Sequence, residues 1–252
     1  MAQPPKPGTV LVTGAAQRLG RAIALHFANR GWRVGVHFNR SAADAASLVE
    51  EIKNLGSEAV ALQADIAQAN ELAPLVKSCG DRLGTPTCLV NNAACYEWDT
   101  LASLGSESWG THLDVNLRAP IFLTQAFAAA LGSQTGNVIN IIDQKVLNPD
   151  PEYFSYTIAK SALWDATKVM AQALAPRVRV NAVGPGPVFR SVRQDTASFE
   201  REWRATPLRK EVAPHEICAA IQFLLETPSI TGQMIAVDSG QHLAWRNETA
   251  GA

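Results

Sequence analysis

The sequence predicts an α/β fold in which helices cover both faces of a parallel sheet, and three observations carry this prediction. Short apolar runs alternate with segments of helical periodicity along the 252 residues. The first apolar run ends in a glycine turn that opens a helix. No repeat, low-complexity stretch or linker interrupts the alternation. Strands that are buried on both faces form continuous apolar runs, and a crossover helix joins each strand to the next.

Each element is expected from its own pattern. Thr9–Val12 is a β-branched run, and the helix after it, which ends near Gly31, carries an apolar stripe at helical spacing. The other expected strands are Arg33–Phe38, Glu58–Gln63, Cys88–Val90, Val138–Ile142, Val178–Val183 and Met234–Val237. The other expected helices are Ala43–Leu55, Leu72–Cys79, Trp109–Leu131, Phe154–Ala175 and Pro214–Leu225. About seven strands in one sheet predict a single-domain, doubly wound Rossmann fold over residues 1–252, which binds ligands at the carboxyl ends of its strands.

One segment breaks the rhythm. Residues from about 188 to 212 are polar and arginine-rich and separate a strand from the last helix. Insertions of this kind in compact α/β domains are usually lids or binding loops, so we expect a substrate loop here. Trp203 in this loop is a candidate substrate contact, and Trp98 and Trp245 are further candidates to close the pocket. The alternative is that these tryptophans anchor an oligomer interface.

Composition excludes several function classes. Twenty-two basic against 23 acidic residues give a net charge of −1, which supplies no general field for nucleic acid or an anionic membrane. The four cysteines form no CxxC pair and have no histidine at ligand spacing, so we expect neither a metal site nor a disulfide framework. The N-terminus lacks the apolar segment of a signal peptide, and no apolar run is long enough to span a membrane. We expect a cytoplasmic protein whose partner is a small-molecule substrate.

The first strand-to-helix turn, Thr13 to Gly20, carries two glycines. Such glycines let the backbone approach a pyrophosphate, which then lies at the positive end of the helix dipole. The alternative is a turn that needs glycine for its own geometry. Because the turn opens the first βαβ unit, we favour a dinucleotide site that includes Gly14 and Leu19.

The end of the second strand reads His37-Phe38-Asn39-Arg40-Ser41 and contains no carboxylate. NAD-selective sites usually hold the ribose 2′-hydroxyl there with an acid, whereas an arginine fork and a serine hydroxyl suit a 2′-phosphate. We therefore expect NADP(H) as the cofactor and His37, Asn39, Arg40 and Ser41 among its contacts. The alternative is that Arg40 simply faces solvent.

Two further places complete the expected cofactor site. Arg18 is placed to flank the same phosphate region as Arg40. Asp65 and Ile66 follow the third strand and are placed to contact the adenine, although an Asp at a strand end is also a common helix cap.

The expected catalytic residues include Tyr156 and Lys160, which share one helix face at spacing i, i+4. A phenol with a pKa of about 10 exchanges protons poorly near neutrality, and a nearby ammonium favours the phenolate, so we expect Lys160 to lower the pKa of Tyr156. Asp143 ends the preceding strand, at the same edge of the sheet. Asn116 lies in a helix interior, where an Asn costs helix propensity, so it has either a structural or a catalytic reason.

Taken together, Thr13-Gly14 with Gly20, Asn91-Asn92-Ala93, Asn116, Tyr156-x-x-x-Lys160 and Val183-Gly184-Pro185-Gly186 resemble the short-chain dehydrogenase/reductase family in this order. The resemblance covers nearly the whole chain and implies an NAD(P)-dependent oxidoreductase. It implies that Tyr156 passes the proton, that Lys160 also holds the nicotinamide ribose, and that Asn116 anchors a relay water. Further expected cofactor contacts are Asn92, Ala93, Pro185, Gly186 and Val188. The family also suggests a homo-oligomer, a tetramer by analogy.

Two departures from the family pattern, Asp143 and Arg18, restrict the class of substrate. The family usually has Ser where this chain has Asp143, and an ionised carboxylate cannot donate to a carbonyl oxygen that develops negative charge. Asp143 therefore favours C=N over C=O reduction. Together with Arg18, it makes the chain similar to the pteridine reductases, a resemblance that implies a substrate contact for Arg18. It also implies that Tyr96, which follows Asn-Asn-Ala, stacks on the pterin; the alternative is a partly buried loop tyrosine.

These residues predict an NADPH-dependent reductase of a C=N or C=O substrate, most consistent with a pteridine-type (dihydropterin or dihydrofolate) reductase. The first alternative is a general carbonyl or 3-oxoacyl reductase of the same family. A second alternative, a non-catalytic NADP-binding regulator, is disfavoured because Tyr156, Lys160 and Asn116 are all present.

Overall fold

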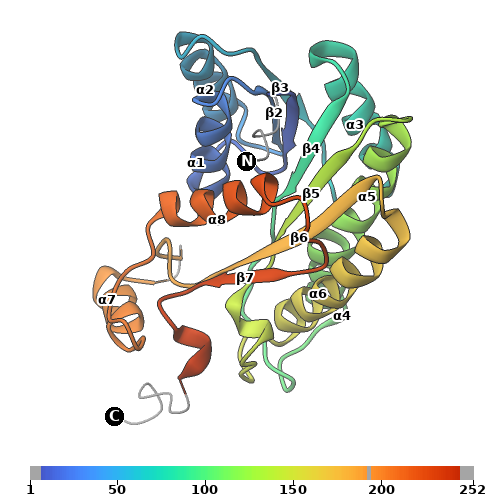
Figure 1. The fold of residues 1–252 in the computed structure, drawn as a ribbon. Coiled ribbons are helices and arrows are strands. Elements are labelled where there is room, and N and C mark those ends of the chain that lie inside the picture. The colour runs from blue at the N-terminus through green and yellow to red at the C-terminus, as the bar shows by residue number, and fades with distance from the viewer. Residues whose placement is uncertain (1–6, 192–193, 245–252) are drawn as a thin grey trace.

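The seven strands form one parallel sheet. The computed structural model describes residues 7–191 and 194–244, and its strand order is β3-β2-β1-β4-β5-β6-β7 (Figure 1). The strands are β1 (Thr9–Val12), β2 (Arg33–Phe38), β3 (Ala59–Gln63), β4 (Pro86–Asn91), β5 (Gly136–Ile141), β6 (Val178–Pro185) and β7 (Met234–Val237). Val12 of β1 lies opposite Val36 of β2 on one side and Val90 of β4 on the other. The chain therefore reverses its direction of winding at β1 and β4, where doubly wound sheets bind ligands.

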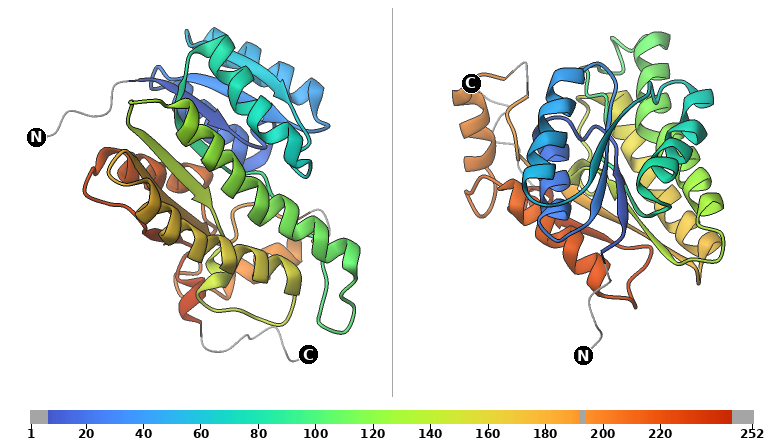
Figure 2. Two further views of the ribbon diagram at one scale, coloured as in Figure 1. Left: turned by 90° about the vertical axis from the view of Figure 1, so that its right-hand side faces the viewer. Right: turned by 90° about the horizontal axis from the view of Figure 1, so that it is seen from above.

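Helices pack on both faces of this sheet, as predicted (Figure 2). The helices of the described residues are α1 (Arg18–Ala28), α2 (Ala42–Asn54), α3 (Ala69–Leu83), α4 (Ser106–Leu113), α5 (Ala119–Ala130), α6 (Phe154–Leu174), α7 (Thr196–Arg204) and α8 (Pro214–Glu226), of which α7 does not pack on the sheet. Successive side chains of β1 point to opposite faces: Val10 and Val12 join the core under α1, α2 and α8, and Leu11 joins the core under α3 and α5. Two buried apolar layers thus fix the sheet.

The helix expected over 109–131 differs in detail from the prediction. A π-helical turn, Asp114–Arg118, separates α4 from α5 without breaking the run. Such turns occur mostly at functional sites, because the extra residue redirects the side chains around it. Asn116 is the buried residue of this turn. Its low helix propensity was therefore a sequence signal for the π turn.

The segment expected as a substrate loop contains a helix of its own. Asp195 caps α7 by accepting a hydrogen bond from Ser198 N at 2.6 Å, and none of the residues of α7 is buried. Figure 1 shows α7 standing apart from the two helical layers, next to the C-terminal part of the chain. Trp245 lies outside the described residues. Among the described helices, none is long and apolar enough to cross a membrane.

Candidate active site

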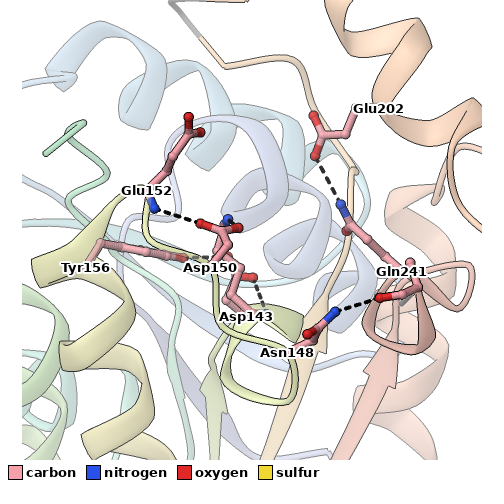
Figure 3. Close-up of polar contacts among 9 residues, drawn as sticks. Asp143, Asn148, Asp150, Glu152, Tyr156, Glu202 and Gln241 are labelled. Carbon is pink, nitrogen blue, oxygen red and sulfur yellow. Dashed lines mark hydrogen bonds and ion pairs between the residues drawn. The ribbon is translucent and has the colours of Figure 1, made fainter. Parts of the chain in front are cut away.

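Tyr156 and Asp143 meet at the carboxyl edge of the sheet. Tyr156 is 5% exposed, and its hydroxyl donates a hydrogen bond to Asp143 Oδ2 at 2.8 Å (Figure 3). The second carboxylate oxygen, Oδ1, accepts from Lys145 N at 2.9 Å, because Asp143 caps the short 3₁₀ helix Gln144–Val146. Both oxygens of Asp143 therefore have fixed donors, one from the backbone and one from the phenol.

Lys160 lies beside this pair, one helical turn after Tyr156. Its Nζ donates to the carbonyl of Ile141 at 2.8 Å and lies 5.8 Å from the centre of the Tyr156 ring. The i, i+4 spacing thus brings both side chains to the end of β5, as the sequence predicts. Burial lowers the pKa of Lys160 to about 8, although the Asp143 carboxylate opposes this change.

The expected effect of Lys160 on the phenol is not found. Burial, followed by the Asp143 carboxylate, raises the pKa of Tyr156 well above its ordinary value. Burial also raises the pKa of Asp143, while its hydrogen bonds from Lys145 N and Tyr156 favour the ionised form. The reason is geometric: the phenol points at a carboxylate rather than at the ammonium. Tyr156 is therefore a protonated donor in this arrangement.

An aromatic cluster surrounds the phenol. Tyr96 is stacked on Tyr153 with ring centroids 4.1 Å apart and an interplanar angle of 7°, and it meets Tyr156 edge to face at 4.7 Å. The chain has three tyrosines, so this cluster holds all of them. Tyr96 stands where the resemblance expects it, with 40% of its surface exposed. Sequence reasoning missed Tyr153, whose only signal was its place three residues before Tyr156.

The glycine turn is closely packed. Gly14 has φ +61°, and a Cβ there would come within 3.0 Å of Ala93 Cα. A Cβ on Gly20 would come within 2.1 Å of the Gly14 carbonyl oxygen, so both positions require glycine. Asn92 Nδ2 donates to the carbonyls of Thr13 at 2.9 Å and Gly14 at 3.2 Å. Asn92 and Ala93 therefore lie against the turn, as expected.

His37 has a different place from the one expected. Its ring is 2% exposed; Nδ1 accepts from Gly14 N at 3.0 Å, and Nε2 lies 3.1 Å from the Ala64 carbonyl. Since an amide can only donate, Nδ1 carries no proton and Nε2 carries one. Burial lowers the pKa of His37 to about 4. Both ring nitrogens are engaged with backbone, so the ring braces the glycine turn and does not point at a phosphate.

Asn39 and Arg40, which follow β2, have exposed side chains, and Ser41 is partly exposed. Arg40 is exposed, and Ser41 precedes α2 without making a capping hydrogen bond through its side chain. Asn39 Nδ2 donates to Asp65 Oδ1 at 3.3 Å, which brings the ends of β2 and β3 together. Ile66, which follows Asp65, is buried.

Arg18 ties the glycine turn to the inserted segment. Its Nη2 donates to the carbonyls of Phe189 at 3.3 Å and Arg190 at 2.9 Å, and the guanidinium lies 5.4 Å from the centre of the Phe189 ring. Just before them, β6 ends at Pro185, and a Cβ on Gly186 would come within 2.6 Å of Asp238 Cα. Val188 is buried at the start of the insertion.

Comparison with known proteins agrees with this arrangement. A family model described as enoyl-(acyl carrier protein) reductase matches residues 14–242. The 3-oxoacyl-[acyl-carrier-protein] reductase of Synechocystis sp. is 34% identical over 235 residues, which cover 91% of this chain and 95% of that protein.

The chain belongs to the short-chain dehydrogenase/reductase family.

Two solved structures of this family are especially similar. One is FolM alternative dihydrofolate reductase 1 from Brucella canis complexed with NADP, with a TM-score of 0.94, 41% identity and 100% coverage of both chains. The other is FolM alternative dihydrofolate reductase 1 from Brucella suis in complex with NADP, with a TM-score of 0.92, 43% identity and coverage of 96% of this chain and 98% of that one. The predicted seven-stranded Rossmann fold is confirmed, and the protein is an oxidoreductase of this family.

In this reductase, the side chain of Asn116 is committed to the backbone. Asn116 is fully buried; its Nδ2 donates to Cys95 O and its Oδ1 accepts from Cys95 N, both at 2.9 Å. This geometry supports the structural alternative for the side chain, because both amide atoms are bonded to the backbone of Cys95.

Trp203 and its neighbour Glu202 lie on α7. The Trp203 ring packs under the guanidinium of Arg204 at 5.1 Å, a contact within the helix itself. Glu202 accepts from Gln194 Nε2 at 2.6 Å and from Gln241 Nε2 at 3.4 Å, and Figure 3 shows it across from Tyr156. Among the described residues, no group of three or more His, Cys, Asp or Glu side chains is arranged to hold a metal ion.

Proposed function

We propose that this protein is an NADPH-dependent reductase of a pteridine-type substrate, a dihydropterin or dihydrofolate, and that it acts on a C=N bond. The observation that carries the proposal is the hydrogen bond from Tyr156 to the buried Asp143 carboxylate, 2.8 Å long. Support also comes from the two Brucella proteins described as alternative dihydrofolate reductases.

Apart from His37, whose ring is bonded to the backbone, the residues at the end of β2 fit a nucleotide with a 2′-phosphate. Arg40 and Ser41 offer a guanidinium and a hydroxyl that makes no capping bond, and the end of β2 contains no carboxylate to repel an anion. Ser41 also precedes α2, whose N-terminus favours negative charge. Gly14 meanwhile keeps the turn free of a side chain. Similar structures are complexed with NADP or NADPH, which agrees with this fit.

Bound NADPH would supply the hydride. The chain's own residues then have to deliver a proton to the ring nitrogen, and Asp143 and Tyr156 form the unit that holds it. Burial raises the pKa of Asp143 toward neutral pH. An acid is most effective at protonating an imine nitrogen when its pKa lies near the pH at which the enzyme works. Tyr156 stays protonated and supports the carboxylate from which the proton has left.

Lys160 and Tyr96 would orient the reactants. Lys160 uses one of its three N–H donors on Ile141, which leaves two for the nicotinamide ribose. Tyr96 would present an aromatic face to a flat heterocycle, the arrangement in which stacking is favourable. Arg18, held at the insertion, lies where a substrate between the turn and Phe189 would meet it.

The second candidate function is reduction of a 3-oxoacyl thioester, which the Synechocystis relative favours by its description. Asp143 argues against it, because its ionised form repels the oxyanion that develops on a carbonyl oxygen, whereas it stabilises a ring nitrogen that has taken up the proton. The test is NADPH oxidation by the wild-type enzyme with dihydropterins, quinonoid pterins, cyclic imines and 3-oxoacyl esters. We expect kcat/KM to be highest for a dihydropterin; a higher value for a 3-oxoacyl ester would replace the proposal by the second candidate.

We further propose that the protein is cytoplasmic and assembles as a homotetramer. Support for assembly comes from large apolar side chains that are exposed on helices: Phe122 of α5, Ile158 and Val169 of α6, and Phe223 of α8. Surfaces of this kind often mark interfaces. Light scattering should give about four times the mass of the 27.0 kDa chain; a mass of one chain would contradict the assembly.

A further inference from the structure

His112 is a buried histidine that the proposed chemistry does not use. It lies on α4, is fully buried, and has both ring nitrogens engaged. Nε2 accepts from Glu97 N at 3.1 Å, and Nδ1 lies 2.6 Å from Ser155 Oγ. Since the amide can only donate, Nε2 carries no proton and Nδ1 carries the single proton of a neutral ring. Ser155 Oγ in turn donates to Asp99 Oδ2.

This chain of hydrogen bonds ends on the segment that carries Tyr96, residues 95–99, which we name the tyrosine strap. The strap is held before Tyr96 by Asn116, which binds both backbone groups of Cys95 at 2.9 Å. It is held after Tyr96 by His112, through Glu97 N. Both backbone neighbours of Tyr96 are therefore fixed by buried side chains from the helical run of α4 and the π turn.

The far end of the strap is joined to the catalytic helix. Asp99 is 3% exposed; its Oδ1 accepts from Ser155 N at 3.1 Å, and its carbonyl accepts from Phe154 N at 3.2 Å. Ser155 directly precedes Tyr156. The ring of His112 also lies edge to face against Tyr156, with centroids 6.2 Å apart. One buried network thus fixes the Tyr96 backbone relative to the start of α6.

We propose that His112 is a positioning residue that sets the ring of Tyr96 for stacking on an aromatic substrate. This inference rests on the proposed function, because Tyr96 matters to catalysis only if the substrate is a flat heterocycle. The neutral ring is essential, since a protonated imidazole has two donors and cannot accept from Glu97 N. Burial lowers the pKa of His112, against the Asp99 and Glu97 carboxylates, which agrees with a neutral ring.

Two substitutions of His112 test the roles of its two ring nitrogens separately. In His112→Asn, the amide lies near the position of Nδ1 and does not reach Glu97 N. In His112→Gln, the longer side chain places its oxygen near the position of Nε2 and can accept from that amide. We expect His112→Asn to raise the KM for dihydropterin about tenfold with a smaller change in kcat, and His112→Gln to stay within about threefold of wild type. NADPH affinity should be unchanged in both.

Two controls decide whether His112 acts through Tyr96. In a Tyr96→Ala background, His112→Asn should change the KM by less than twofold, because the ring it positions is gone. Equal effects of His112→Asn with and without Tyr96 would overturn the proposal. A KM that rises equally in His112→Asn and His112→Gln would overturn it as well.

A spectroscopic readout keeps this test independent of turnover. All three tyrosines lie in the cluster, so fluorine NMR of 3-fluorotyrosine-labelled protein reports on this site alone. His112→Asn should shift the Tyr96 resonance, assigned with Tyr96→Phe, and His112→Gln should leave it near its wild-type position. If neither His112 variant folds, Ser155→Ala, which removes the Nδ1 partner and also the hydroxyl that donates to Asp99 at the far end of the strap, should shift the same resonance. An unmoved Tyr96 resonance would overturn the positioning role, whereas absence of dihydropterin turnover with a shifted resonance would contradict only the proposed function.

Discussion

The glycine turn and the tyrosine cluster occupy the same edge of the sheet, and each is braced by a buried neutral histidine that accepts a backbone N–H. At the glycine turn, His37 accepts from Gly14 N through Nδ1. At the tyrosine cluster, His112 accepts from Glu97 N through Nε2. The two rings therefore have opposite tautomers. In both regions a histidine holds backbone, and neither ring is placed to bind a ligand.

The two regions differ in what they present. Near the glycine turn, Arg40 and Arg18 are exposed cations on a closely packed backbone. In the tyrosine cluster, Tyr156, Asp143 and Lys160 are ionisable groups whose pKa values burial shifts away from their ordinary values. Changes near the turn should therefore alter cofactor affinity, and changes in the cluster should alter rate and pH dependence.

The largest expected effect is in the cluster. Tyr156→Phe removes the hydroxyl that donates to Asp143 but keeps the ring and its packing. We expect kcat to fall by about 10³, within the range for loss of acid catalysis, because Asp143 loses the hydroxyl that supports its carboxylate after proton transfer; the Kd for NADPH should stay within about twofold. Stopped-flow NADPH oxidation and cofactor fluorescence measure the two quantities. Unchanged turnover would remove Tyr156 from the mechanism.

A smaller effect, on cofactor affinity, is expected near the glycine turn. Arg40→Ala removes an exposed guanidinium without disturbing the core, and it should weaken NADPH binding about 10- to 100-fold, as expected for a charge-assisted pair with phosphate. The Kd for NADH, which lacks the 2′-phosphate, should change by less than threefold. Titrations with both cofactors compare them directly, and equal losses would show that Arg40 does not contact the 2′-phosphate.

An effect of a different kind, on stability rather than on activity, is expected in acid. Burial lowers the pKa of His37 in the folded protein from the ordinary value of 6.5 to about 4, so the folded state binds fewer protons than the unfolded state. Its contribution to stability is full above about pH 6.5 and is lost as the pH falls to about 4, an effect of about 3 kcal/mol. Urea unfolding across this range measures it.

His37→Asn, which keeps an acceptor for Gly14 N, is the matched control for this effect. The variant should show a flatter dependence of the free energy of unfolding on pH between about 6.5 and 4. The same slope in both proteins would mean that His37 does not carry the acid sensitivity.

Most of the fold could be predicted from the sequence because its signals are local. The runs Thr9–Val12 and Arg33–Phe38 match β1 and β2, and the spacing of Tyr156 and Lys160 on a helix fixes their common direction. The limits of α3 were less clear, since Pro74 lies inside the helix that extends to Leu83. Local pattern is a good guide where propensity and burial agree.

The parts that could not be predicted depend on long-range partners. His37 was expected to contact the cofactor, but its ring is turned inward by Gly14 N and the Ala64 carbonyl, contacts that no spacing reveals. Lys160 was expected to act on Tyr156, but the phenol points to Asp143 instead. Tyr153 joins the cluster through an αL backbone conformation, φ 53°, that a tyrosine rarely adopts.

The proposed preference for C=N bonds rests on Asp143 and its hydrogen bond from Tyr156. The most direct test is the ratio of kcat/KM for dihydropterin to that for a 3-oxoacyl ester in wild type and in Asp143→Ser, which restores a donor suited to a carbonyl oxygen. We expect the ratio of kcat/KM for dihydropterin to that for the 3-oxoacyl ester to fall at least about 100-fold in Asp143→Ser, mainly through loss of dihydropterin reduction. A ratio that is unchanged, with dihydropterin turnover intact, would contradict it.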